Sequence, residues 1–467
     1  MIKDRNQSDI LFGLNDKPSI PLCINGAIQH IMACFIGVIT PSLLIGSILG
    51  LEEEIPYLVS MSLFISGIAT FIQAKKFGPV GCGLIAVSGT SFAFLNALII
   101  TGLSVKNRGG SNEEILSIML GICFFGAFIE IILSQFIDKI KKVITPLTSG
   151  IVITTIGISL IKVGVTDFAG GFGSDNFGNT TNLGIGTFVL VIIIALNISS
   201  NPWLRLSSIM IGMISGSILA MSLGMMNFDN IASLPLFSAP IPFKYGFNFD
   251  LELFAPVALI YFLTALETSG DLTANSLFCN LPIKGDSYFK RIKGGILADG
   301  INSLIAAVFN TFPNTTFGQN NAVIKMTGIA SRHVAYYISF FLIILGLFPV
   351  IGGVFQAIPK PVLGGATLIL FSTIAVAGIK ILASEEIDRR KSLIIATSLG
   401  VGLGVLVVPE ALQQLPEAIK NVLSSSVTTA GFTAIFMTIL LPDPKNIEPQ
   451  NIEKNLSESK TSETKLS

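Results

Sequence analysis

Three acidic side chains stand inside apolar segments of the sequence. Glu267 and Asp271 belong to PVALIYFLTALETSGDLTANS (256–276), and Asp299 belongs to GGILADGINSLIAAVF (294–309). The first two are four residues apart, so a helix places them on one face. An acid at membrane depth is costly and is by default a functional group, and because desolvation favours its neutral form it can carry a proton near neutral pH. The alternative is a structural acid that pairs with a helix-end amide or with a lysine.

A second polar group lies in TTFGQNNAVIKMTG (315–328), where three carboxamides, Gln319, Asn320 and Asn321, precede Lys325. Unpaired backbone in lipid costs several kcal/mol per group, so a broken segment survives only where protein or a water-filled cavity covers it. Half-helix N-termini near mid-membrane favour partial negative charge on a ligand. The segment therefore predicts a hydrogen-bonding surface for a small polar solute; the alternative is that the carboxamides only hold helices together.

The same kind of segment occurs twice. GTSFAFLNALI (89–99) and NTTFGQNNAVI (314–324) align without gaps and share Thr, Phe, Asn, Ala and Ile at matching positions. They fall at the third and the tenth of the spans predicted below, seven spans apart. An odd number of spans per repeat makes the two copies run in opposite directions, which is the inverted repeat of many secondary transporters.

Composition indicates the environment of these elements. Of the 467 residues, 51% are hydrophobic and 12% are charged, with a mean hydropathy of +0.74. Soluble domains carry about 25% charged residues, so the chain is predicted to be a polytopic membrane protein. The formal net charge is zero, which gives no reason to expect a nucleic-acid partner. Fourteen predicted spans are centred near residues 34, 63, 94, 124, 154, 190, 215, 262, 303, 320, 341, 371, 400 and 433.

The positive-inside rule orients these spans. Fourteen spans with the N-terminus inside place most lysines and arginines of the loops in the cytoplasm. Residues 1–20 have no apolar signal-peptide core and are expected to form a cytoplasmic N-terminal segment. Residues 442–467, rich in Lys, Glu, Ser and Asn, are expected to form a disordered cytoplasmic tail. Both termini are thus expected on the cytoplasmic side of the plasma (inner) membrane.

The remaining polar side chains in the spans are open to two interpretations. His30, beside Gln29 in GAIQHIMACF, is either a packing residue or a functional one, and Glu130 in FIEIILSQF lies near the cytoplasmic end of its span, where a structural role is favoured. The five cysteines are scattered and the two histidines stand apart, so neither a metal site nor a cofactor is expected. No Ser–His–Asp order or HExxH motif suggests an intramembrane enzyme.

The segment TTFGQNNAVIKMTGIASR resembles the signature of the nucleobase–ascorbate transporter family, also called the nucleobase:cation symporter-2 or xanthine/uracil permease family. That signature is Gln or Glu, Asn, any residue, Gly, four residues, then Thr. Gln319, Asn320 and Thr327 match it, whereas Ala322 replaces the usual Gly. LETSGDLTA around Glu267, LADG, GTSFAF in the third span and QH in the first span also match, in the family's order.

The resemblance implies an all-α fold of fourteen spans in two inverted seven-span repeats, with spans 3 and 10 interrupted by short strands. Spans 1–4 and 8–11 would form a core domain, and spans 5–7 and 12–14 a gate domain through which two copies pair as a homodimer. In this chain the core halves would be residues 21–142 and 251–350, and the gate halves residues 143–225 and 351–441.

The resemblance also implies the roles of the site residues. Glu267 would hydrogen-bond a base, and Gln319 would hold it from the other side. The Phe317–Gly318 backbone would donate to base carbonyls. Ser91 and Phe92 would line the pocket. Four further residues would couple transport to protons or order the site: Asp271, Asp299, His30 and Asn320.

The implied function is secondary active import of a purine base by proton symport through elevator-like alternating access, with sodium as the alternative coupling ion. Members with Gln at the first signature position tend to prefer xanthine or uric acid, so Gln319 favours a purine, and the small Ser91 leaves room for the extra oxygen of uric acid. Xanthine is the first expectation and uric acid the second. The alternatives are a uracil permease of the same family and an anion transporter of the same fold.

Overall fold

A computed structural model describes most of the chain: residues 10–137, 145–171, 173–228, 231–283, 285–318, 320–384 and 386–441. Three features predicted from the sequence lie outside these residues, wholly or in part. They are Gln319, the tail 442–467 and the first nine residues of the N-terminal segment 1–20.

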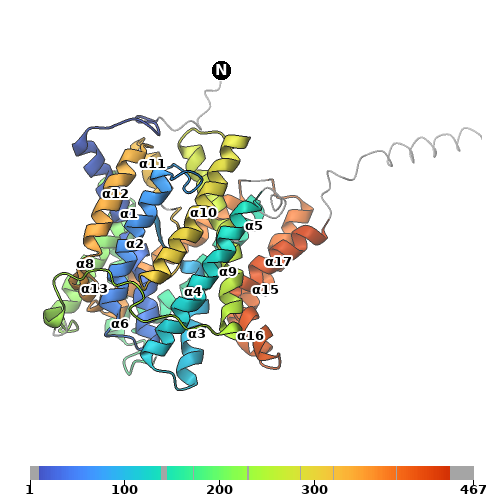
Figure 1. The fold of residues 1–467 in the computed structure, drawn as a ribbon. Coiled ribbons are helices and arrows are strands. Elements are labelled where there is room, and N and C mark those ends of the chain that lie inside the picture. The colour runs from blue at the N-terminus through green and yellow to red at the C-terminus, as the bar shows by residue number, and fades with distance from the viewer. Residues whose placement is uncertain are drawn as a thin grey trace, which may run out of the picture.

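The described part of the chain is mainly helical, and its helices form one bundle (Figure 1). In chain order, the α-helices are α1 (Ile20–Leu49), α2 (Ile55–Lys75), α3 (Leu95–Asn107), α4 (Asn112–Gln135), α5 (Pro146–Phe168), α6 (Thr180–Asn197), α7 (Pro202–Leu206), α8 (Ser208–Ser222), α9 (Leu251–Phe278), α10 (Asp286–Val308), α11 (Asn320–Thr327), α12 (Arg332–Leu345), α13 (Pro349–Gln356), α14 (Lys360–Leu382), α15 (Arg389–Val407), α16 (Glu417–Leu423) and α17 (Ser426–Leu440). In Figure 1, α15, α16 and α17 lie along one side of the bundle, and α12 and α13 lie along the other.

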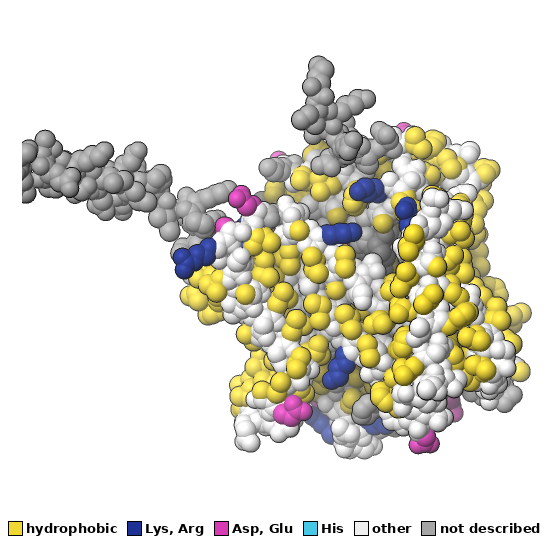
Figure 2. All heavy atoms as spheres, turned by 180° about the vertical axis from the view of Figure 1, so that it is seen from behind, with side chains coloured by type: hydrophobic (Ala, Val, Ile, Leu, Met, Phe, Trp, Pro, Cys, Tyr) yellow, Lys and Arg dark blue, Asp and Glu magenta, His cyan; other side chains and the backbone are white. Residues whose placement is uncertain are grey.

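The helices are those of a multi-pass membrane protein. Within the described residues, eight are long and apolar enough to cross a membrane, or up to nine if α12 and α13, bent by 77° at their junction, form one broken span. Every predicted span centre falls in a helical element, yet several of those elements are shorter than a full span. The count of fourteen spans therefore stays a prediction. Figure 2 shows a face on which hydrophobic side chains cover the middle and charged ones gather toward the two ends.

Two short strands interrupt the helices where the sequence predicts broken spans. β1 (Ser88–Thr90) and β2 (Asn314–Thr316) pair antiparallel, with Gly89 opposite Thr315. The lack of a side chain at Gly89 permits this crossing. A Cβ atom there would be too close to its neighbours, at 2.8 Å from the Phe317 ring and 2.8 Å from a Val38 methyl group. A 3₁₀ turn (Phe92–Phe94) and α3 follow β1, and α11 follows β2. The two segments that resemble each other in sequence thus lie side by side and run in opposite directions.

Glycines permit close packing of α5 against α14, on another side of the bundle. A Cβ atom on Gly157 would meet the backbone of Ala375, and one on Gly378 would meet the backbone of Thr154. Small residues at a helix crossing let backbones approach closely, and dispersion replaces the hydrophobic effect as the source of stability in lipid.

Candidate functional site

The predicted site residues gather around the β1–β2 crossing. The strands are surrounded by α1, α2, α9 and α10, and α11 packs against both α1 and α9. Of the predicted residues within the described ranges, Glu267 and Asp271 come from α9 and Asp299 comes from α10. His30 lies on α1 and Asn320 opens α11. Segments far apart in the sequence therefore meet at one place in the membrane region.

Asp299 is the best-connected acid of the site. It is fully buried, and its two oxygens accept separate hydrogen bonds. Oδ1 accepts from Gln73 Nε2 on α2 at 2.7 Å, and Oδ2 accepts from Thr268 Oγ1 on α9 at 2.5 Å. The Thr268 hydroxyl also lies 3.2 Å from Thr315 Oγ1 on β2. Asp299 therefore connects α10 to α2 and α9 directly and, through Thr268, to β2.

Gln73 is a site residue that the sequence did not predict. Besides its bond to Asp299, Nε2 donates to the Gly295 carbonyl at 2.9 Å, and Oε1 accepts from the Cys82 amide at 3.1 Å. Its side chain is fully buried. The sequence signal was weak, because Gln73 directly precedes the charged end of α2 and resembles an interfacial polar residue.

Asp271 holds the start of the α11 segment against α9. Gly318 lies so close to the Asp271 carboxylate that a Cβ atom on residue 318 would collide with Oδ1. Asn321 Nδ2 donates to the Asp271 carbonyl at 3.2 Å. The Phe317 amide donates to Val87 O at 2.8 Å, so this N–H belongs to the strand crossing in this structure.

Glu267 is less well connected than Asp299. Its side chain is half-buried, and its Oε2 atom is buried without a hydrogen bond to any described residue. An unsatisfied buried acceptor costs about 1–3 kcal/mol, more when it is charged, so the position suits a ligand donor or a proton. Further buried side chains with unpaired polar atoms belong to the strands and to the start of α11: Ser88, Thr90, Asn314, Thr316 and Asn320.

Ser91 and Phe92 form the turn that follows β1. The Ser91 amide donates to Pro313 O at 2.8 Å, and its hydroxyl accepts from the Ala93 amide at 3.3 Å, which caps the 3₁₀ turn. Phe92 is buried and lies edge-on to Phe371 of α14, with ring centroids 5.5 Å apart. Phe92 thus links the strand crossing to a helix of the predicted gate domain.

His30 and Asn320 connect α1 to α11. Both are buried, and Asn320 Nδ2 lies 3.1 Å from His30 Nδ1 and 3.1 Å from the His30 carbonyl. Since an amide nitrogen can only donate, Nδ1 of the neutral ring is the acceptor and the ring proton is on Nε2. Lys325, further along α11, is exposed and lies over the Phe278 ring at 5.7 Å. Among the described residues, no ion pair joins Lys325 to an acid.

Gly318→Ala is expected to lower substrate uptake roughly tenfold, because the new methyl group must displace Asp271 and overpacking of this kind costs about 1–3 kcal/mol. The matched control is Gly400→Ala, since nothing lies within 4 Å of a Cβ atom at residue 400. Uptake normalised to the amount of protein in the membrane checks the prediction. Equal uptake by the two variants would show that the contact between Gly318 and Asp271 is not needed.

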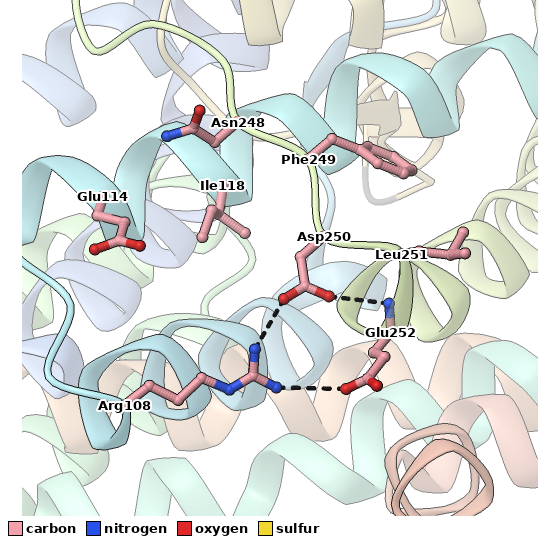
Figure 3. Close-up of a pocket in the computed structure, with 8 residues that line it drawn as sticks. All are labelled: Arg108, Glu114, Ile118, Asn248, Phe249, Asp250, Leu251 and Glu252. Carbon is pink, nitrogen blue, oxygen red and sulfur yellow. Dashed lines mark hydrogen bonds and ion pairs between the residues drawn. The ribbon is translucent and has the colours of Figure 1, made fainter.

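An open surface pocket lies elsewhere, at the ends of α3 and α9 (Figure 3). Arg108 Nη1 is 2.9 Å from Asp250 Oδ2, and Arg108 Nη2 is 3.5 Å from Glu252 Oε2. Asp250 also caps α9 by accepting from the amides of Glu252 and Leu253. None of the predicted site residues lines this pocket, and the ion pairs of Arg108 join the end of α3 to the start of α9 there.

Comparisons with known proteins identify the family of this chain. The family model of a permease family matches residues 23–411. Xanthine permease XanQ of Escherichia coli strain K12 is 46% identical over 93% of this chain and 94% of XanQ, and xanthine permease XanP of the same strain is 44% identical over 95% and 97%. The transmembrane domain of the cyanobacterial bicarbonate transporter BicA superposes with a TM-score of 0.54 at 14% identity, over 87% of this chain and 99% of that one. The chain therefore belongs to the xanthine/uracil permease family, the nucleobase–ascorbate transporters, and is a multi-pass membrane transporter and not an enzyme.

Proposed function

We propose that the protein imports a purine nucleobase, xanthine first and uric acid second, by proton symport through elevator-like alternating access. The observation that carries this proposal is the buried, unpartnered Oε2 atom of Glu267 next to the crossed strands. Two relatives that are 44–46% identical over most of the chain are named xanthine permeases, which supports the substrate class.

The chemistry of an oxidised purine fits the site. Its edge alternates N–H donors with carbonyl acceptors, and a carboxylate such as Glu267 accepts from ring N–H groups. Gln319, outside the described residues, can both donate and accept from the opposite side. In this proposal, Ser91 and Phe92 line the binding site for the base, and the Phe317–Gly318 backbone faces the carbonyl groups of the base. The Phe317 amide is bonded to Val87 in this structure, so it would have to leave that bond to donate to the base.

The proposed domains are the core halves 21–142 and 251–350 and the gate halves 143–225 and 351–441, within fourteen spans that form two inverted repeats. Antiparallel pairing of β1 with β2 supports the repeat, because two equivalent segments meet across a local two-fold axis. The core would move against the gate, and two copies would pair through their gate domains. Both termini would lie in the cytoplasm beneath the inner membrane.

Proton coupling follows from the acids of the site. Moving a charged acid through the membrane interior is costly, so taking up a proton on one of Glu267, Asp271 or Asp299 favours movement of the loaded core domain. Asn320 and His30 would keep α11 in place during this movement. Base and proton then leave on the cytoplasmic side, and the inward proton gradient drives accumulation.

Uptake of radiolabelled xanthine into cells that lack their own purine carriers tests the proposal. Unlabelled uric acid and hypoxanthine are expected to compete more strongly than uracil, and a protonophore is expected to stop accumulation. Strong competition by uracil alone would favour the pyrimidine alternative. Accumulation that ignores collapse of the pH gradient but follows sodium would overturn proton coupling.

An anion transporter of the same fold is the second candidate, because the structure superposes on the bicarbonate transporter BicA. At 14% identity this likeness concerns the fold alone. Glu267 is expected to repel an anion at the site, so it favours a neutral base with N–H donors.

A further inference from the structure

One buried acid has no role in the transport cycle described above. Glu130 lies on α4 and is only 1% exposed. In Figure 1, α4 runs beside α9 and α10, the two helices that carry the acids of the site. Two glycines permit the close approach: a Cβ atom on Gly126 would collide with the Tyr261 ring of α9, and one on Gly300 would lie 2.9 Å from the Ile131 amide nitrogen. Glu130 is therefore enclosed where three helices meet.

The hydrogen bonds around Glu130 match a neutral acid. Among the described residues, its hydrogen-bonding neighbour is Thr264 on α9, whose Oγ1 lies 3.5 Å from Glu130 Oε1. The Thr264 hydroxyl has a single hydrogen. Its oxygen Oγ1 lies 3.1 Å from the Tyr261 carbonyl oxygen, which is closer than Glu130 Oε1, and donates to that carbonyl. Because that hydrogen is shared with the carbonyl, Thr264 can donate only a long, weak hydrogen bond to an ionised Glu130. A protonated Glu130 carboxyl could instead donate to the Thr264 hydroxyl oxygen.

Within the described part of the chain, no ion pair compensates a charge on Glu130, and its Oε2 atom is buried without a hydrogen-bond partner. An unpaired buried carboxylate costs several kcal/mol even after relaxation of its surroundings. Enclosure and the lack of a donor both disfavour the charged form.

The titratable groups that face Glu130 are all acidic or neutral. Asp299 of α10 and Glu267 of α9 lie close enough for their charges to interact with it, and so does the phenol of Tyr261. The third neighbouring helix, α3, has one titratable side chain within its bounds, Lys106, and this donates to Leu49 O at 2.7 Å. A charge on Glu130 would therefore repel the two acids of the site.

We propose that Glu130 is a second proton-holding residue of the transporter, whose proton keeps the charge of the Glu130–Glu267–Asp299 group low. While Glu130 is neutral, Glu267 can be the charged acceptor for the base. If Glu130 loses its proton at alkaline pH, the core domain carries an additional buried charge beside the two acids, which disfavours movement of the loaded core. Glu130 thus sets the alkaline limit of uptake. This effect on uptake rests on the proposed function, whereas the protonation of Glu130 does not.

Infrared spectroscopy of the purified protein in lipid tests the protonation directly. Wild-type protein at neutral pH is expected to show a protonated-carboxyl C=O band that is weaker in Glu130→Gln. The matched control is Glu113→Gln, an exposed acid on the same helix, which is expected to leave the band unchanged. A band of equal strength in wild type and Glu130→Gln would mean that Glu130 is ionised, and would overturn the inference.

Thr264→Val provides a second variant that keeps the wild-type acid. It removes the proposed acceptor of the Glu130 proton, so the C=O band is expected to persist at a higher frequency. If the band vanished or did not move, Thr264 would not be the acceptor and the assignment would fail. This variant remains informative if Glu130→Gln is not produced in the membrane.

The pH profile of xanthine uptake tests the consequence for transport. The alkaline midpoint is expected to rise by about one pH unit in Glu130→Gln, the size of a shift caused by one like charge nearby. Ionisation of xanthine itself affects both proteins alike. Superimposable profiles would overturn the role in uptake. Absence of xanthine uptake in wild type would instead refute the proposed function and leave the infrared result to decide on Glu130.

Discussion

Glu267→Gln is expected to weaken binding and uptake of xanthine about 10- to 100-fold. A hydrogen bond to a charged acceptor contributes about 1.5–3 kcal/mol, and every 1.4 kcal/mol is a tenfold change in affinity. Glutamine keeps the size of the side chain, so packing of α9 against the strands is preserved. Its amide group would present a donor where the base also presents one, which adds to the loss.

The matched control for Glu267→Gln is Glu252→Gln, an exposed acid in the first turn of the same helix. Its ion pair with Arg108 lies at the surface, and exposed pairs of this kind contribute only about 0–1 kcal/mol. Competition binding in membranes separates affinity from transport rate. If Glu267→Gln bound xanthine as well as wild type, Glu267 would not be the acceptor for the base. If it gained bicarbonate uptake, the site would belong to an anion carrier.

The strands and the acids of the site could be predicted because they conflict with their surroundings. Glu267 and Asp299 stand in runs of apolar residues, and Gly89 and Gly318 belong to segments too polar and too rich in small residues for ordinary helices. Each is unusual within its own stretch of about twenty residues, which is the length that membrane crossing sets. The structure contains a strand in both segments.

The partners of those residues could not be predicted, because they come from distant parts of the chain. Gln73 reaches Asp299 from another helix, and the bond between Phe317 and Val87 depends on how the two strands cross. Glu130 shows the same limit. Its position along the chain suggested the end of a span, whereas the packing of α9 and α10 buries it. The hydropathy of a segment predicts how deep each of its residues lies in the membrane. It does not predict which residues of other helices contact them.

Asp299→Asn is expected to abolish gradient-driven uptake while the protein stays folded. The asparagine Oδ1 can accept from Gln73, and its Nδ2 can donate to Thr268. The Thr268 hydroxyl can then turn toward Thr315, 3.2 Å away. The Gln73 and Thr268 side chains thus remain paired, and the substitution removes the charge of residue 299. Asp299→Leu would instead leave Gln73 and Thr268 without their acceptor, at a cost of about 1–3 kcal/mol for each group.

Comparing two kinds of flux identifies what the charge of Asp299 does. Accumulation of xanthine requires proton release, whereas exchange of labelled for unlabelled xanthine across the membrane does not. If Asp299 carries the coupled proton, Asp299→Asn loses accumulation at least about tenfold and keeps exchange; loss of both would assign it to ordering the site. The matched control is Asp286→Asn, an exposed acid at the start of the same helix, and melting temperatures of all variants check the fold. Wild-type accumulation in Asp299→Asn would contradict both roles, because a permanently neutral side chain can neither release a proton nor supply a charge.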